Sequence, residues 1–341
     1  MPINPVAHYQ QALSTALEDR ARGYQDLVSN NNVLSAVLKR KGLFKPYSGP
    51  RIRETLQINK ADVQWYSGYD FLDNPPIELF NDAYFTPKGV VVPVSLAMDE
   101  ILDNEGSNQI IDIMEAYMDA AERALMDGWD TAIYSDGTAN GGKQIGGLGV
   151  AVPVVTNTGT YGGIDRSAYP IWRTSTFNAH TDFPSIGTQV TKDTIRPMLL
   201  NIFQKRTRGR QAADLLIMSP EHYAAYDASL VAQQRITSDK PTSLGSLGFT
   251  SMEFVGAGRR VEIVMEGGIG SNMPANTTFG LHTDSLRIRY NPERNFDKLF
   301  EGDGQKPINQ DAIAQFIGWR GELTMVNPLF NWRFYDSTPA S

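Results

Sequence analysis

The spacing of apolar side chains predicts that one long helix organises the chain. From Ser107, a suitable N-cap, apolar residues recur every three or four positions, and acidic residues fall outside that stripe. The pattern runs to Tyr134 and ends at Asp136-Gly137, with a break at Gly128 as the alternative. A helix of roughly 40 Å needs a broad sheet or several partners to cover its stripe. The stripe consists of Ile110, Ile113, Met114, Tyr117, Ala121, Ala124 and Leu125.

Two shorter helices are predicted ahead of the long one. Residues 5–22 and 32–41 both show helical spacing of apolar positions. Three basic residues fill the last turn of the second helix, where their positive charges interact favourably with the negative end of the helix dipole. Gly42 then provides its C-cap.

Residues 51–98 are predicted to form an extended excursion of two to three strands. The apolar period changes to two, with Ile52, Leu56 and Ile58 on alternate positions, which is typical of a half-buried strand. An isolated hairpin is marginal in water. Because this one carries many aromatic residues, we expect it to rest on another surface, of the same chain or of a neighbour. The further strands are expected at residues 63–66 and 84–95. The aromatic residues are Trp65, Tyr66, Tyr69, Phe71, Phe80, Tyr84 and Phe85.

The chain after the long helix has the pattern of an α/β segment. A helix is expected at residues 192–206, a buried strand at 214–218 and a second helix from Pro220 to Val231. Short strands follow, and the chain ends in a terminal segment after Pro328. The strands are expected at residues 261–265, 278–282, 286–290, 312–319 and 323–326, and the terminal segment is 330–335.

Composition places the chain among folded proteins without disulfides. It has 341 residues, 41% hydrophobic and 20% charged, which suits two domains or one large one. The absence of cysteine excludes thiol catalysis, thiolate metal sites and a disulfide scaffold. The N-terminus does not have the pattern of a signal peptide, and the longest apolar run, residues 90–98, is too short to span a bilayer.

Charge is unevenly distributed along the chain. The net charge of −7 argues against nucleic-acid binding as the main role. Residues 1–50 carry six Lys/Arg and three Asp/Glu, a net of +3, whereas residues 51–105 carry four and ten, a net of −6. The basic and acidic segments of neighbouring chains could attract one another, and ordinary solvated surface charge is the alternative.

The sequence offers little for catalysis. Residues Gly137–Lys143 fit the first seven positions of a phosphate-binding loop, which makes an NTPase the rival hypothesis. However, a predicted helix precedes them instead of a strand, and Gln144 stands where the magnesium-binding hydroxyl belongs. None of the four histidines has a second ligand at metal-binding spacing. We expect no catalytic, cofactor-binding or metal site, and no enzymatic activity.

An ordered series of short motifs resembles the major capsid proteins of tailed bacteriophages, the Hong Kong 97-type family. The resemblance covers nearly the whole chain, and it depends on the order of the motifs, since each is weak alone. The motifs are Arg53-Glu-Thr-Leu-Gln-Ile, Trp65-Tyr-Ser-Gly-Tyr-Asp, Asp103-Asn-Glu-Gly, Tyr134-Ser-Asp-Gly, Gly146-Gly-Leu, Tyr161-Gly-Gly-Ile-Asp-Arg, Trp172-Arg, Met273-Pro-Ala-Asn, Asn309-Gln-Asp-Ala and Trp319-Arg-Gly-Glu-Leu-Thr.

The resemblance implies an α+β fold with four parts. These are an N-terminal arm, an extended loop that overlies a neighbouring subunit, a peripheral domain with the long spine helix and a β-sheet, and an axial α/β domain. The arm would be residues 1–50, the extended loop 51–98, the peripheral domain 99–146 with 276–320, and the axial domain 147–275 with 321–341.

The same resemblance implies a structural protein that self-assembles into hexamers and pentamers of an icosahedral shell around viral double-stranded DNA. The shell would belong to the virion and would be assembled in the cytoplasm of a host bacterium, without a membrane. The expected partners are further copies of the chain, a separate scaffold protein, a portal and a decoration protein; prior cleavage of a scaffolding segment is the alternative to the separate scaffold. An encapsulin-like compartment is the alternative within the fold. Intersubunit contacts are expected at Arg51, Arg53, Trp65, Tyr66, Tyr69, Phe71, Tyr84 and Phe85.

Some relatives crosslink a lysine of the extended loop to an asparagine of a neighbour. The candidates here are Lys60, which Asp62 follows, and Lys88, in a turn expected to be wet. Both settings favour the charged ammonium, which is a poor nucleophile. We therefore expect shells that are held by non-covalent contacts.

Overall fold

The long helix forms as one continuous element. Helix α4 (Ser107–Tyr134) passes through Gly128 without a break. The computed structural model describes residues 32–57, 63–72, 79–97, 107–231, 251–267, 272–299 and 311–338. The helix predicted at residues 5–22 lies outside them.

The buried face of α4 follows a spacing of four residues. Its members are Ala121, Leu125, Trp129 and Ile133. Tyr117 and Ala124, which were predicted to belong to the buried stripe, are exposed. The adjacent sheet covers only one side of the helix, and that side carries the large side chains of Trp129 and Ile133. Tyr117 and Ala124 lie outside it.

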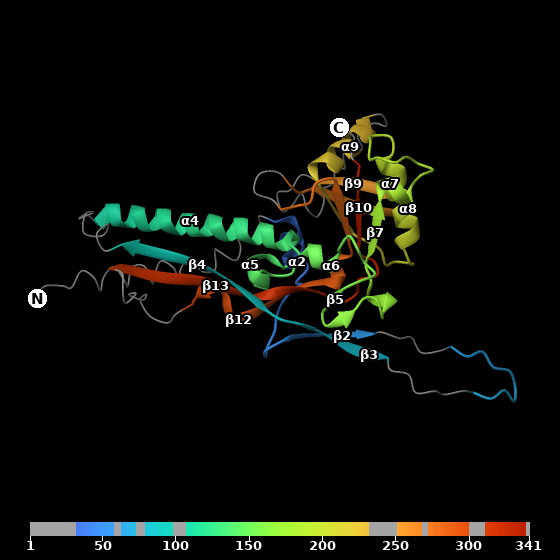
Figure 1. Cartoon of the computed structure of the whole chain (residues 1–341), viewed down its shortest axis with the longest axis horizontal. Coiled ribbons are helices and arrows are strands. Elements are labelled where there is room, and N and C mark those ends of the chain that lie inside the picture. The colour runs from blue at the N-terminus through green and yellow to red at the C-terminus, as the bar shows by residue number, and fades with distance from the viewer. Residues whose placement is uncertain are drawn as a thin grey trace, which may run out of the picture.

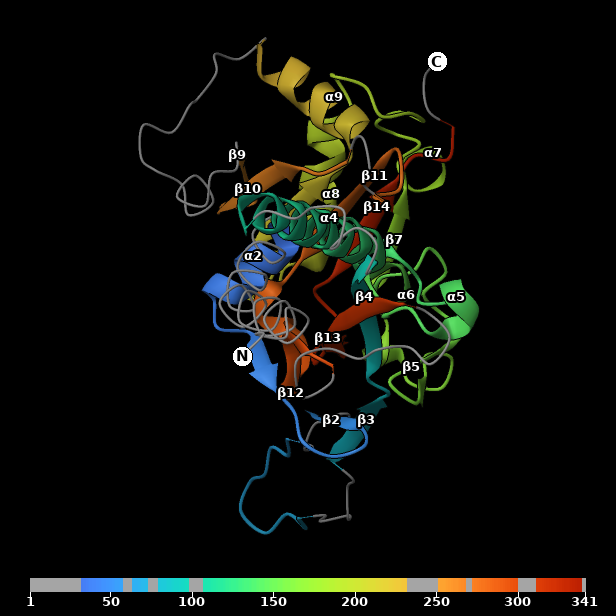
Figure 2. The ribbon, with the colours of Figure 1, turned by 90° about the vertical axis from the view of Figure 1, so that its left-hand side faces the viewer.

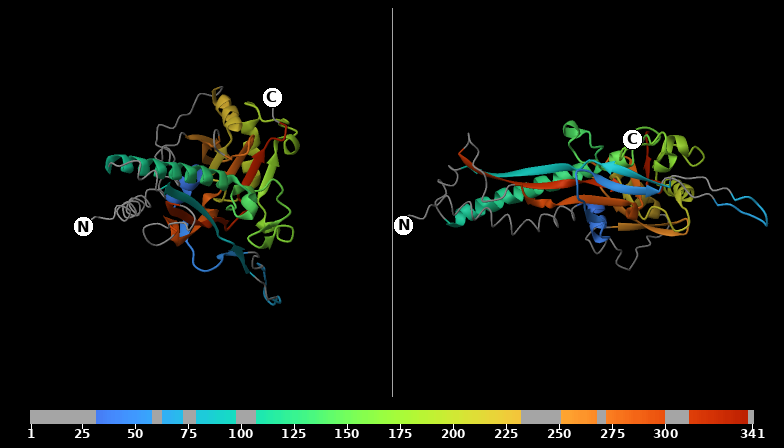
Figure 3. Two further views of the ribbon diagram at one scale, coloured as in Figure 1. Left: turned by 60° about the vertical axis from the view of Figure 1, so that its left-hand side comes forward. Right: turned by 90° about the horizontal axis from the view of Figure 1, so that it is seen from below.

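A four-stranded sheet runs along α4 (Figure 1). Its strand order is β1-β12-β13-β4; the β1–β12 pair is parallel and the other pairs are antiparallel. Seen from below, the helix and these long strands give the molecule an elongated outline (Figure 3). The strands are β1 (Phe44–Pro46), β4 (Lys88–Ala97), β12 (Leu286–Lys298) and β13 (Ala312–Met325).

Helix α2 (Val33–Arg40) precedes the first strand of this sheet and ends at the predicted C-cap, and the structure adds an N-cap that was not predicted. The Asn32 side chain accepts a hydrogen bond from the Ser35 N–H at 3.2 Å. At the other end, Gly42 adopts φ +67°, and the Leu43 N–H reaches the Leu38 carbonyl at 2.9 Å. This arrangement closes the helix as a Schellman motif does.

A six-stranded sheet forms the second body, with helices α8 (Ile195–Arg206) and α9 (Pro220–Val231) packed on it (Figure 1). Strand β8 (Leu215–Met218) is buried throughout because it lies between two cores. Leu216 and Met218 join the core under α8 and α9, and Leu215 and Ile217 join the core under α4. The strand order is β7-β14-β11-β8-β10-β9. The other strands are β7 (Ser175–Asn178), β9 (Ser251–Gly256), β10 (Arg259–Met265), β11 (Thr277–Leu281) and β14 (Trp332–Tyr335).

Short elements link these larger ones. Those between α4 and β7 are α5 (Ala139–Gly142), α6 (Leu148–Ala151), β5 (Thr160–Tyr161), β6 (Ile164–Asp165) and the 3-10 turn η1 (Pro170–Trp172). The others are α7 (Ala179–Asp182) after β7 and the 3-10 turn η3 (Thr283–Ser285) before β12.

The sheets correct three predicted boundaries. The strands predicted at 312–319 and 323–326 are one strand, β13, which crosses the expected domain boundary after residue 320. Strand β11, expected with the segment 276–320 of the spine-helix domain, lies in the six-stranded sheet between β14 and β8. Strand β4, expected within the loop 51–98, pairs with β13. Periodicity reports which face a residue occupies but not which strand it pairs with, so only the tertiary structure could place these strands.

Candidate assembly surface

A hairpin leaves the body of the molecule (Figures 1 and 2). Its strands, β2 (Ile52–Gln57) and β3 (Phe80–Phe85), pair antiparallel, and β2 shows the predicted alternation of buried and exposed residues. Beyond the paired strands, residues 63–72 lie far from the body. The strand predicted at 63–66 is not formed, since these residues belong to none of the sheets that the structure describes.

The inner face of β3 packs on the chain's own core. Phe85 meets the Tyr161 ring edge to face, with 5.1 Å between the ring centroids. The adjacent Gly162 has φ +58°, and a Cβ there would lie 2.8 Å from Cζ of Phe85. Phe85 is therefore only 6% exposed. It was expected at an intersubunit contact, and this expectation is wrong because the inward phase of the strand places it inside its own chain.

A buried ion cluster fixes the base of the hairpin to the four-stranded sheet. Glu54 of β2 is 2% exposed. One carboxylate oxygen, Oε1, accepts from Nε of Arg289 at 2.6 Å and from Oγ1 of Thr324 at 3.2 Å. The other, Oε2, accepts from Arg287 at 2.9 Å. A buried carboxylate needs such partners, so the cluster determines how the hairpin leaves the sheet.

The aromatic tip, which we define as residues 63–72, is not covered by the described part of the chain. Tyr69 and Phe71 have exposed fractions of 108% and 100%, and Trp65 has 94%. Tyr66 is exposed as well. Exposed apolar side chains of this size make the tip the candidate interaction surface of the described residues.

The remaining predicted contact residues lie on the outer face of the hairpin. Arg51 is exposed. Arg53 forms an ion pair with Asp82 across the two strands at 2.7 Å. Hydrogen bonds from Arg53 and Thr55 lower the pKa of Asp82 below its ordinary value. Tyr84 is partly exposed beside this pair. All three predicted residues are available to a neighbouring molecule.

Comparison with solved structures identifies this architecture. The chain matches no model of a known sequence family and no curated protein sequence. It matches a chain of the cyanophage A-1(L) capsid asymmetric unit with a TM-score of 0.62 and 16% identity, covering 87% of this chain and 92% of that one. The chain has the fold of a tailed-phage major capsid protein. A chain from the capsid of a native GTA particle matches with a TM-score of 0.53 and 11% identity, over 89% and 90% of the two chains. The predicted Hong Kong 97-type α+β fold is confirmed.

Within this capsid fold, the candidate crosslinking lysines have different positions. Lys60 lies outside the described residues. Lys88 begins β4 and is half-buried, in contrast to the wet turn that we expected. Its Nζ donates to the carbonyl oxygen of Gly137 at 3.2 Å. The ammonium is thus engaged by the turn that follows α4.

The rival phosphate-binding segment has the wrong surroundings in the capsid fold. Residues Gly137–Lys143 follow helix α4, whereas a phosphate-binding loop follows a strand and opens a helix. Within them, Asn140 and Gly141 adopt left-handed conformations, and the next helix, α6, has only four residues. No group of three or more His, Asp or Glu side chains within the described ranges could hold a metal ion. None of the described helices is long and apolar enough to cross a membrane.

A second buried carboxylate joins β13 to the glycine turn after α4. Oε1 of Glu322 accepts from the Gly146 N–H at 2.5 Å. Burial raises the pKa of Glu322 to about 8, although the hydrogen bond from Gly146 and the charge of Lys88 act in the opposite direction. The turn packs closely against the last residues of α4. A Cβ added to Gly147 would lie only 2.2 Å from the Ile133 carbonyl oxygen.

Sequence reasoning missed both carboxylates. Glu54 stands between Ile52 and Leu56, in the inward phase of the predicted strand. A charged residue at an inward position requires a buried partner. The carboxylate at an apolar position of the strand pattern was therefore the signal that could have revealed the cluster. The partners on β12 and β13 are more than 200 residues away, so no local pattern could name them.

Proposed function

We propose that this chain is the shell-forming subunit of a bacteriophage-like capsid, in which hexamers and pentamers build an icosahedral particle around double-stranded DNA. The observation that carries the proposal is the aromatic tip on a projecting hairpin. An isolated subunit leaves four aromatic side chains exposed to water, which is unfavourable. Contact with a neighbouring copy would bury them. The fold shared with capsid chains supports the same conclusion.

The contact would be heterologous, since the tip and the surface that it covers are different parts of the same chain. Heterologous contacts generate rings when the rotation between copies closes, which is the geometry of hexamers and pentamers. The protein would act by burying interfaces and not by catalysis. Because each contact is repeated around the shell, a modest area per subunit suffices.

The parts of the fold suggest a division of roles that follows the two sheets. Residues 1–50 would form the arm, and residues 51–87 the extended loop that overlies a neighbour. Helix α4 with the four-stranded sheet would form the peripheral domain. The six-stranded sheet with α8 and α9 would form the axial domain at the capsomer centre. In the virion the partners would be further copies of the chain, a scaffold protein during assembly in the host cytoplasm, a portal and a decoration protein.

Electron microscopy of the purified protein tests the proposal. We expect closed particles of uniform size in negative stain, with hexameric and pentameric units in averaged images. A monomer of uniform size under every condition of salt, pH and concentration would contradict the proposal.

The contents of native particles separate a capsid from an encapsulin-like compartment. Double-stranded DNA that is protected from nuclease inside the particles supports the capsid. Particles that contain cargo protein and no DNA would assign the compartment role instead. The enclosed DNA would be held without sequence recognition, in keeping with the net charge of −7.

A further inference from the structure

Lys88 and Glu322 lie on either side of the segment that follows helix α4. We call residues 137–146 the α5 segment. A Cβ on Gly137 would lie 3.1 Å from Nζ of Lys88 and 3.1 Å from the Gly146 Cα. A Cβ on Gly146 would lie 2.9 Å from Oε1 of Glu322. Because both positions are glycine, they place no side chain between the ammonium and the carboxyl group.

Each of these two side chains holds one end of the α5 segment. Nζ of Lys88 donates to the Gly137 carbonyl oxygen at 3.2 Å. The Gly146 N–H donates to Oε1 of Glu322 at 2.5 Å. The strands that carry the two side chains are neighbours, since Lys88 of β4 pairs with Gly321 of β13, the residue before Glu322. The two contacts therefore fix the segment to the same part of the four-stranded sheet.

The second carboxyl oxygen of Glu322 lacks a comparable contact. Glu322 is 5% exposed, and its Oε2 is buried without a hydrogen-bond partner among the residues that the structure describes. A buried carboxyl group without a partner is far more costly when it is ionised than when it is protonated. Burial accordingly raises the pKa of Glu322 to about 8, so the arrangement in the structure is that of the neutral acid.

Lys88 is the cation that faces this carboxyl group. Its charge acts to lower the pKa of Glu322 and also that of Asp136, just before the α5 segment. The Asp136 carboxylate is already held by the N–H and the hydroxyl of Thr138, at 3.0 Å and 2.7 Å. Tyr161 of β5 is the other titratable group beside Glu322, and burial raises its pKa, so it stays protonated. An ionised Glu322 would therefore have Lys88 as its counter-ion.

We propose that the α5 segment has a proton-controlled tether: ionisation of Glu322 draws the Lys88 ammonium from the Gly137 carbonyl oxygen to Oε2 of Glu322. The proton passes to solvent, no covalent bond in the chain is made or broken besides that O–H bond, and the buried carboxylate gains the partner that it requires. The Gly137 carbonyl loses its contact, whereas the Gly146 N–H keeps its own. The first part of the segment, residues 137–143, is therefore the part that is released.

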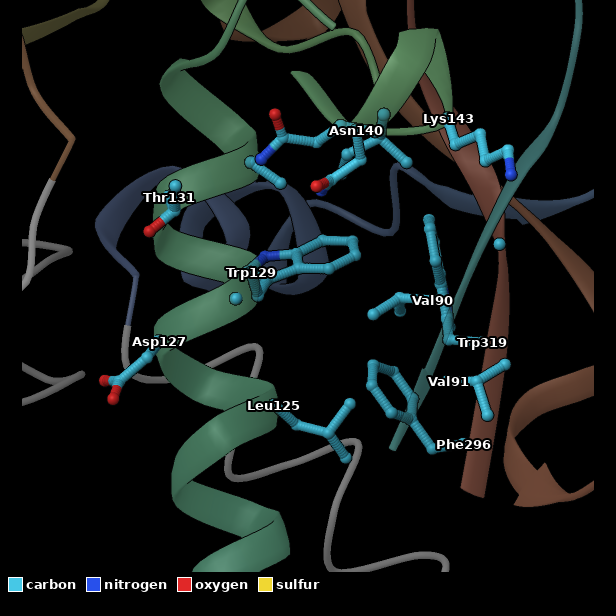
Figure 4. Close-up of a pocket in the computed structure, with 15 residues that line it drawn as sticks. Val90, Val91, Leu125, Asp127, Trp129, Thr131, Asn140, Lys143, Phe296 and Trp319 are labelled. Carbon is cyan, nitrogen blue, oxygen red and sulfur yellow. The ribbon is translucent and has the colours of Figure 1, made fainter. Parts of the chain in front are cut away.

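The tethered segment forms one end of a cavity. The cavity has a volume of about 520 Å³, lies between α4, β4 and β13, and has the rings of Trp129, Phe296 and Trp319 in its lining. Asn140 and Lys143 of the α5 segment line the same cavity (Figure 4). Release of the segment therefore opens the cavity to solvent. The inference concerns the single subunit, so it does not depend on shell assembly.

Hydrogen exchange of the full-length, unassembled subunit tests the tether, with labelling times scaled to the intrinsic exchange rate at each pH. Between pH 7 and pH 9 we expect peptides within residues 137–143 to lose about tenfold or more in protection, while peptides from β8 keep theirs. Glu322→Gln stays neutral, so its segment should remain protected at pH 9. Glu293→Gln, at an exposed position of β12, is the matched control and should lose protection as the wild type does.

A Lys88→Met variant keeps the test decisive if Glu322→Gln fails to fold. Without the ammonium the segment has no tether at either pH, so its protection should be low at pH 7 and should show no step toward pH 9. A step of wild-type size in Lys88→Met would overturn the inference. So would a wild type whose segment is equally protected at pH 7 and pH 9, or a step that persists in Glu322→Gln. Shell assembly is measured separately by electron microscopy, and none of these outcomes alters it.

Discussion

Nε of Arg289 donates to Oε1 of Glu54 at 2.6 Å, which fixes the base of the projecting hairpin to the four-stranded sheet. Arg287 holds the second carboxylate oxygen at 2.9 Å. The hairpin has only two strands, and such a unit is marginal alone. Its direction therefore depends on this buried contact and on the packing of Phe85 against Tyr161.

Removing the Glu54 carboxylate should destabilise the subunit strongly. Glu54→Ala leaves two half-buried arginines without their partner, and breaking an ion pair that is buried on one side costs up to about 3–5 kcal/mol. Glu293→Ala, an exposed glutamate on β12, is the matched control and should change stability by less than about 0.5 kcal/mol. Urea denaturation of the unassembled subunit measures both. Equal losses in the two variants would contradict the role of the cluster.

Glu322 should make stability depend on pH. Burial raises its pKa in the folded chain from the ordinary 4.5 to about 8. Between these values the folded chain keeps a proton that the unfolded chain has lost, so the free energy of unfolding falls as pH rises through this window and levels off above it. Glu322→Gln should remove this contribution and flatten the dependence.

The measurement is the denaturation midpoint from pH 5 to pH 9 in wild type and Glu322→Gln. Burial also raises the pKa of Glu266, to about 7, so the wild type and the variant must be compared at each pH. Identical pH profiles would show that Glu322 does not titrate as the structure indicates.

The tip and the base of the hairpin should respond to mutation in opposite ways. The triple substitution Trp65→Ala, Tyr69→Ala and Phe71→Ala alters exposed rings, so the isolated subunit should keep its stability while shells fail to form. Phe85→Ala should instead cost the subunit about 3–5 kcal/mol, because it empties part of a core. Denaturation and electron microscopy together distinguish the two effects. Normal shells from the triple variant would contradict an assembly role for the tip.

Alanine substitutions at Gly147 and Gly128 should have opposite effects on stability. A Cβ on Gly147 would lie 2.2 Å from the Ile133 carbonyl oxygen, so Gly147→Ala should prevent the turn from packing and lower the yield of folded protein. A Cβ on Gly128 would have no atom within 4 Å, so Gly128→Ala should stabilise the helix by about 1 kcal/mol. Thermal denaturation tests both variants. A tolerated Gly147→Ala would mean that the turn can move away from the helix.

Mature shells should dissociate into single chains. The Lys88 ammonium is already engaged with the Gly137 carbonyl oxygen, and a charged ammonium is a poor nucleophile. Particles boiled in SDS under reducing conditions should therefore run as one band near 37.8 kDa. A ladder of multimers would contradict this, and Lys60→Ala and Lys88→Ala variants would then show which lysine reacts.

The candidate surface was partly predictable from sequence because its residues are close together in the chain. The aromatic residues between Trp65 and Phe71 stood out as too many for a thin hairpin, and the structure leaves them exposed. The same reasoning failed at Phe85, because a count of aromatic residues does not say which ones face inward. The cavity was not foreseeable, since α4, β4, β12 and β13 supply its walls from distant parts of the chain.

The sequence by itself determined the local elements: the long helix to Tyr134, the alternation in β2, and the start of α9 at Pro220. Helical and strand periods, caps and turn residues act over a few positions, so they can be recognised without a fold. Tertiary structure alone decided that β4 and β13 pair, that β11 lies between β14 and β8, and that Glu54 meets Arg289. These relationships depend on which distant segments bury one another's apolar faces and satisfy one another's charges, and no local period encodes that choice.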